Sequence, residues 1–82
     1  MQVKMHFICP ELFKLLPDGP YEIPDGSTVQ SCVECCAAAG GVTLPENWSD
    51  QVIFLQDYNP ALRRDAASEG VEIVVLRRIL GG

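Results

Sequence analysis

Hydrophobic and polar positions alternate at the start of the chain and form an apolar run near its end. In residues 2–8, Val3, Met5 and Phe7 fall on one side of an extended backbone and the intervening residues on the other. This period of two predicts a β-strand with an apolar core face. Residues 71–76 are apolar at every position but one, which is typical of a central strand. We therefore expect a sheet that contains both segments.

The clearest helix is predicted over residues 28–39, where apolar residues recur at intervals of three and four. Ser27 is the expected N-cap residue, and Gln30 completes a capping box with it. Gly40 and Gly41 supply a left-handed stop at the other end. The apolar stripe of this helix consists of Val29, Cys32, Val33, Cys36 and Ala37.

The order strand, strand, helix, strand, short strand, strand predicts an α+β fold of two layers. If the first and last strands lie side by side, they are parallel and central, with the helix across one face. This is the β-grasp (ubiquitin-like) arrangement, with a mixed sheet of four or five strands and one main helix. Trp48 is expected to pack onto the core. The shorter expected elements are a connection with one helical turn at residues 11–16, strands at 21–23, 52–56 and 61–62, a turn at 57–60 and a loop at 42–51.

Composition narrows the class of protein. The 82 residues allow one small domain, and a hydrophobic fraction of 48% is ordinary for a globular chain. A net charge of −5 with only six Lys and Arg residues argues against nucleic acid or an anionic membrane as the partner. The opening residues lack the long apolar stretch of a secretory signal, and no apolar run approaches the ~18–20 residues of a membrane helix. We expect a cytoplasmic protein.

Four cysteines invite a metal or redox interpretation. Without a secretory signal, reduced thiols are expected. Cys32 and Cys36 fall on the core stripe of the helix, where cysteine behaves as a small hydrophobic residue, and Cys35 lies at its flank. A zinc site here would need a ligand from elsewhere, such as Cys9 or His6. Structural thiols are favoured, and a metal-binding module built on Cys32, Cys35 and Cys36, or a reactive Cys35, stays open.

The last six residues are not explained by secondary structure. Glycine is the costliest residue to order, so a pair of glycines after a strand favours a functional role. Six extended residues reach roughly 20 Å, and a backbone without side chains fits a narrow channel. We expect a β-grasp domain at residues 1–76 and a flexible tail at 77–82, whose terminal carboxylate reacts only when activated, for instance as an acyl-adenylate. The tail consists of Arg77, Arg78, Ile79, Leu80, Gly81 and Gly82.

With this tail, the chain resembles the MoaD/ThiS family of β-grasp sulfur carriers, which serve molybdopterin and thiamine biosynthesis, and more distantly ubiquitin. The similar segments are the opening strand at 3–7, residues 25–29 before the helix, the turn at 58–60, and residues 70–76 before the glycines. Residues 77–80 replace the Pro or Pro-Val that often precedes the family's glycines, and look more like the tail of ubiquitin.

The resemblance implies a carrier with no bound cofactor rather than an enzyme. An adenylyltransferase of the ubiquitin-activating type would use ATP and magnesium to join AMP to the Gly82 carboxylate. A persulfide sulfur donor would then displace AMP, and the resulting thiocarboxylate would carry sulfur to a synthase subunit of the molybdopterin, tungstopterin or thiamine type. A ubiquitin-like modifier conjugated to other proteins through Gly82 stays open as an alternative.

A docking surface follows from the alternation of the strands. If the apolar side of the first strand faces the helix, Ile8, Val74 and Leu76 face away from it. We expect these residues to be exposed beside the tail and to bind a partner, unless a loop or a second copy covers them. Arg77 and Arg78 are expected either to meet acidic groups around the activating enzyme's channel or to be solvated.

Overall fold

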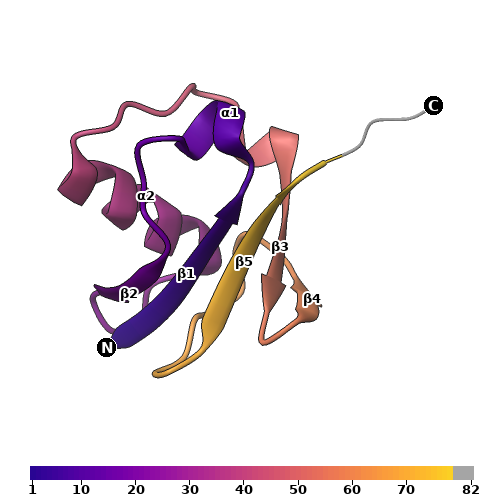
Figure 1. Ribbon diagram of the computed structural model, residues 1–82. Helices are drawn as coiled ribbons and strands as arrows, with labels where there is room; N and C mark the ends of the chain where they lie inside the picture. Colours follow the sequence, from indigo (N-terminus) through magenta and orange to yellow (C-terminus); the bar gives the residue numbers. More distant parts are fainter. Residues whose placement is uncertain (79–82) are drawn as a thin grey trace.

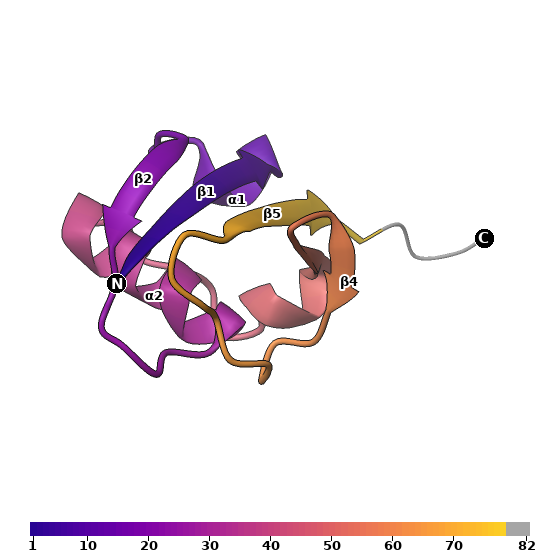
Figure 2. The same cartoon turned by 90° about the horizontal axis from the view of Figure 1, so that it is seen from below.

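The computed structural model describes residues 1–78. It has two layers, a mixed sheet of five strands and a helix that crosses one face of that sheet (Figures 1 and 2). None of the helices in residues 1–78 has the length and apolarity that a membrane crossing requires. The elements are β1 (Gln2–Ile8), α1 (Pro10–Phe13), β2 (Gly19–Glu22), α2 (Val29–Gly40), the 3-10 helix η1 (Trp48–Gln51), β3 (Val52–Gln56), β4 (Asn59–Ala61) and β5 (Glu72–Arg77).

The sheet has the strand order β2-β1-β5-β3-β4, so the first and last strands occupy its centre. β1 and β5 are parallel, with Met5 opposite Ile73. β3 runs antiparallel to β5, with Phe54 opposite Val75. The two outer strands, β2 and β4, are antiparallel to their neighbours. This is the β-grasp order that the sequence predicts, and the predicted α+β class is confirmed.

The hydrophobic core lies between the sheet and α2. The strand residues that alternate toward the helix are buried, and so are all five residues of the helical stripe. Trp48 is 4% exposed, and its ring lies edge-on to Phe13 and Phe54 at centroid distances of 6.1 and 6.0 Å. The prediction that Trp48 packs onto the core is confirmed. The strand residues of the core are Val3, Met5, Val52, Phe54, Ile73 and Val75.

The start of α2 differs from the sequence prediction by one residue. Thr28, not Ser27, is the N-cap, and its Oγ1 accepts a hydrogen bond from the Ser31 N–H at 3.1 Å. The Ser27 hydroxyl instead donates to the Pro24 carbonyl at 2.7 Å, which holds its side chain in the preceding turn. The predicted left-handed stop is confirmed, because Gly41 has φ 68°.

The other predicted boundaries shift by one to a few residues. The hairpin between β3 and β4 is tighter than expected, since only Asp57 and Tyr58 form the turn, with φ 51° and 65°. Residues 59–60, predicted as turn, belong to β4, an edge strand that tolerates proline. β5 includes Arg77, and the Arg78 N–H donates to the carbonyl of Gln51 at 2.9 Å. The first two residues of the expected tail therefore pair with the body.

Candidate functional site

The carboxyl end of β5 is the place from which the sequence-predicted tail departs. Because β1 and β5 are parallel, the end of β5 lies beside α1, which follows β1 (Figure 1). The guanidinium of Arg77 forms an ion pair with the carboxylate of Glu11 in α1, and both side chains are more than half exposed. The backbone N–H of Glu11 itself lowers the pKa of its carboxyl, and the charge of Arg77 adds to this effect. The remaining predicted tail residues, Ile79, Leu80, Gly81 and Gly82, lie outside the described residues.

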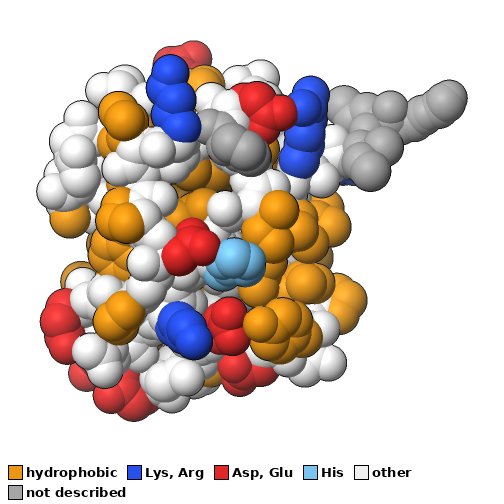
Figure 3. Space-filling model, viewed as in Figure 1, with side chains coloured by type: hydrophobic (Ala, Val, Ile, Leu, Met, Phe, Trp, Pro, Cys, Tyr) orange, Lys and Arg blue, Asp and Glu red, His pale blue; other side chains and the backbone are white. Residues whose placement is uncertain are grey.

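The face of the sheet opposite α2 is apolar next to this end. The strand register aligns Ile8, Leu76 and Ile53 across β1, β5 and β3. A second row lies two residues before Leu76 along β5, and it contains Val74 between His6 on β1 and Leu55 on β3. Figure 3 shows this face with the single histidine in pale blue and hydrophobic side chains gathered beside it. We call Ile8, Ile53, Leu55, Val74 and Leu76 the open-face patch.

Two of the three predicted partner-binding residues are accessible. Ile8 is 45% exposed and Leu76 is partly exposed. The expectation for Val74 was wrong, because it is only 2% exposed. Val74 does face away from α2, but its cross-strand neighbours His6 and Leu55 flank it in the middle of the sheet. An orientation predicted from alternation therefore does not ensure exposure in a central strand.

Sequence reasoning did not find the part of the patch that lies on β3. Ile53 is 46% exposed and Leu55 is half-buried. Both alternate with the buried residues Val52 and Phe54 along β3. This alternation could have predicted from the sequence that Ile53 and Leu55 face away from the core. The patch thus extends over three neighbouring strands, and clustered exposed apolar residues of this kind mark interaction surfaces.

A fixed polar pair borders the open-face patch. The Nδ1 atom of His6 lies 2.5 Å from the Oδ2 atom of Asp18. The other carboxylate oxygen of Asp18 accepts the backbone N–H of Phe7 at 2.8 Å, and this hydrogen bond lowers the pKa of Asp18. Asp18 is therefore charged at neutral pH and orients the imidazole of His6. An apolar centre with an ordered polar border is the usual composition of a protein interface.

Three of the four cysteines are buried in the body of the protein. Cys32 and Cys36 are 0% and 1% exposed on the core side of α2, as the helical spacing predicts. Burial raises the pKa of Cys32 to about 11 and that of Cys36 to about 12. Cys9 is also buried, whereas Cys35 is partly exposed. In the part of the chain that the structure describes, no three His, Cys, Asp or Glu side chains come together as metal ligands.

We expect Cys35 to be the only cysteine that reacts rapidly with a thiol reagent in the folded protein. A buried thiol with a raised pKa offers little thiolate at neutral pH. A chromogenic disulfide reagent should show one fast equivalent in buffer and four in denaturant, matching the four free cysteines. The Cys35→Ser variant should lose the fast phase. A fast phase that persists in folded Cys35→Ser would contradict these assignments.

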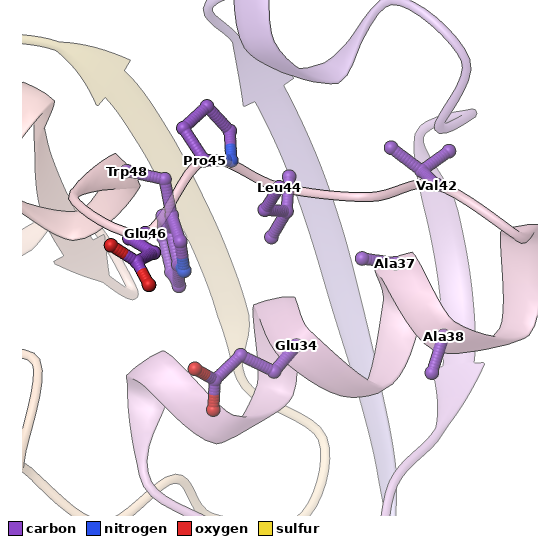
Figure 4. A pocket seen from close by; sticks show the side chains of 8 residues that line it. All are labelled: Glu34, Ala37, Ala38, Val42, Leu44, Pro45, Glu46 and Trp48. Carbon is purple, nitrogen blue, oxygen red and sulfur yellow. The ribbon is translucent and has the colours of Figure 1, made fainter.

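A groove of about 350 Å³ lies between α2 and the connection to β3, away from the open-face patch. Figure 4 shows the indole of Trp48 and the carboxylates of Glu34 and Glu46 around it, with small apolar side chains along the helix. Its lining residues include no thiol, imidazole or cation.

Comparison with known proteins supports the fold. No protein-family model and no curated protein matches the sequence. Small archaeal modifier protein 1 (SAMP1) of Haloferax volcanii matches with a TM-score of 0.69 and 13% identity over 100% of both chains. A second structure of that protein matches with a TM-score of 0.69 and 11% identity over 95% of this chain and 98% of its own. A Pyrococcus furiosus protein described as a candidate molybdopterin converting factor, subunit 1, matches with a TM-score of 0.70 and 13% identity over 96% of this chain and 99% of its own.

These structures, together with the strand order, show that the chain has the β-grasp fold. The resemblance drawn from the sequence is therefore confirmed in the fold. Each match covers at least 95% of this chain and at least 98% of the neighbour's chain.

Proposed function

We propose that the chain is a sulfur carrier whose reacting group is the α-carboxylate of Gly82. The observation that carries this proposal is the Gly81-Gly82 pair, which follows the central strand β5 of a β-grasp body within five residues of Arg77. The Arg78 N–H is bonded to the carbonyl of Gln51, and the four residues that follow Arg78 in the sequence would reach at most ~13–14 Å if fully extended, enough to enter a partner's site from the surface of the body. The proposal requires a free carboxylate at Gly82 in the working protein.

The chemistry begins with an activating adenylyltransferase that supplies ATP and magnesium. A carboxylate oxygen of Gly82 attacks the α-phosphorus of ATP, and pyrophosphate leaves. A persulfide sulfur then attacks the carbonyl carbon, AMP leaves, and an acyl disulfide forms. A thiol reduces this acyl disulfide and frees the thiocarboxylate, while the thiol and the former persulfide carrier are left as a disulfide. The chain supplies the carboxylate and the docking surface, and the partners supply the catalytic groups.

The open-face patch is the proposed docking surface for these partners. It lies at the end of the sheet from which the tail departs, so one partner can cover the patch and receive the tail together. Arg77 already pairs with Glu11, and a partner carboxylate would compete for a guanidinium that is 67% exposed. We propose cytoplasmic partners, in keeping with the reduced thiols expected from the sequence.

Two acceptors of the activated Gly82 are supported by the comparisons. The Pyrococcus furiosus neighbour is described as a molybdopterin converting factor subunit, which supports sulfur transfer of the molybdopterin type for this chain as well. The Haloferax volcanii neighbours are described as modifier proteins, which supports a second candidate function as a protein modifier. In that function the amine of a lysine, rather than a sulfur nucleophile, would displace AMP.

Intact mass spectrometry separates these functions. The purified chain is incubated with the activating enzyme of its own cell, ATP, magnesium and a sulfur donor. A mass gain equal to one sulfur replacing one oxygen supports the carrier, and conjugates of this chain with other proteins support the modifier. An unchanged mass, in a reaction that activates the enzyme's other carrier proteins, would refute both.

We expect Leu76→Glu to weaken binding to the activating enzyme by at least about tenfold, since it places an unpaired carboxylate in the apolar centre of an interface. The melting temperature should change little because Leu76 lies on the open face and is only partly buried. Calorimetric titration and thermal melts measure the two effects.

Leu15→Glu is the matched control, because Leu15 is 68% exposed and lies outside the open-face patch. It should bind like the unmodified chain. Equal binding by Leu76→Glu and Leu15→Glu would show that partners do not use the patch.

A further inference from the structure

A second groove, of about 340 Å³, lies at the outer edge of β3. Two exposed apolar side chains contribute to it, Ile53 at 46% and Leu62 at 57% exposure. Val52 and Phe54 form its inner wall. We call it the β3-edge groove. Its polar rim is formed by Ser49, Asp50, Arg63, Arg64 and Arg78.

The groove exists because β4 is short. β4 pairs with β3 only from Gln56 to Phe54, so Val52 and Ile53 have no β4 partner. The chain after β4 bends toward α2, where the carbonyl of Arg63 accepts the backbone N–H of Gln30 at 2.9 Å. The first part of β3 is thus a sheet edge left open beside exposed apolar side chains, and such an edge can pair with another chain.

The charge of the groove is opposite to that of the molecule. Three of the chain's six basic residues line it, although the net charge of the chain is −5. The single lining carboxylate, that of Asp50, lies 3.3 Å from Arg63 and is already paired with it. Within residues 1–78, neither Arg64 nor Arg78 forms a salt bridge. The rim therefore offers two guanidiniums to an incoming anion.

We propose that the β3-edge groove binds an extended acidic segment of a partner protein, in which carboxylates alternate with apolar side chains. In an extended segment, successive side chains point in opposite directions. Apolar side chains would lie on Ile53 and Leu62, and the carboxylates would meet Arg64 and Arg78. Main-chain pairing with the free part of β3 would add affinity, as in other complexes formed by strand addition.

Electrostatics directs such a segment to this groove. An acidic peptide is repelled by the net charge of −5 and is attracted most strongly where three of the six basic residues gather. Nucleic acid meets the same repulsion over a much larger surface, and it offers no apolar side chains for Ile53 and Leu62. The inference is independent of the chemistry at Gly82.

The test uses the full chain and a fluorescein-labelled heptapeptide of alternating Glu and Val. We expect the peptide to shift the NMR signals of Ile53, Leu62 and Arg64, and its affinity to fall as salt is raised. By fluorescence anisotropy, the double variant Arg63→Glu/Arg64→Glu should bind at least about tenfold more weakly, because two attractions become repulsions. If loss of the ion pair between Arg63 and Asp50 disturbs the fold, the single variant Arg64→Glu replaces the double variant in this measurement.

The matched control for the single variant Arg64→Glu is Lys4→Glu, which makes the same change of charge on the open face and should leave the affinity unchanged. Equal affinity of Arg64→Glu and the unmodified chain would overturn the proposal. So would signal shifts confined to Ile8 and Leu76, since the peptide would then be using the open-face patch. Absence of peptide binding, or binding of ATP in its place at the same arginines, would overturn it as well.

Discussion

Deletion of Gly82 is expected to abolish ATP-dependent activation of the chain. The deletion moves the terminal carboxylate back by one residue, ~3.3–3.6 Å along an extended backbone. Misplacement of a reacting atom by 1 Å costs about 100-fold in rate, so a shift several times larger leaves no measurable reaction. Exchange of radioactive pyrophosphate into ATP by the activating enzyme measures this step.

Addition of one residue after Gly82 should have the same effect, because it moves the carboxylate too far by the same distance. Thermal melts of both variants should match that of the unmodified chain, since the core is built from residues within 1–78. Pyrophosphate exchange at the unmodified rate in either variant would show that Gly82 is not the reacting residue.

A large loss of stability is expected when a core side chain of the central strand β5 is shortened. Ile73→Ala is expected to reduce the free energy of unfolding by about 2–5 kcal/mol, because it removes a fully buried side chain and leaves a cavity. A domain of this size has a total stability of about 4–12 kcal/mol. The melting temperature should therefore fall by at least about 8 °C, measured by circular dichroism or calorimetry.

Ile53→Ala is the matched control, since it removes the same atoms from the neighbouring strand on the opposite face. Ile53 is 46% exposed, so the loss should be less than about 1 kcal/mol. Similar losses in the two variants would mean that the faces of the sheet are assigned wrongly.

The fold was predictable because its central strands have clear patterns. The period of two in β1 and the apolar run in β5 predict inner strands, and the order of elements leaves the β-grasp as the simplest arrangement. The helical stripe likewise predicts that Cys32 and Cys36 are buried, and they are. These features depend on burial alone, which the spacing of apolar residues reports directly.

Features that depend on local hydrogen bonding were predicted less well. Ser27 and Thr28 are both good caps, and the choice between them depends on the bond from Ser27 to Pro24, which the sequence does not display. The turn at Asp57 and Tyr58 uses two positive φ angles without glycine, so composition predicted a longer turn over residues 57–60.

The candidate site was only partly predictable because it depends on strand register. Alternation placed Ile8 and Leu76 on the open face, but only the pairing of β3 with β5 brings Ile53 beside them. The same pairing shields Val74, which the sequence predicted to be exposed. The β3-edge groove depends on where β4 ends, and boundaries of short strands are not set by periodicity.

The most direct test of the central claim is the chemical state of Gly82 in the chain recovered from its own cells. The protein is alkylated with iodoacetamide during lysis, and its C-terminal peptide is examined by tandem mass spectrometry. We predict that part of the population ends at Gly82 with an alkylated sulfur in place of a carboxyl oxygen. A peptide that continues past Gly82, or one that carries only the unmodified carboxylate in cells making the sulfur-containing product, would contradict the account.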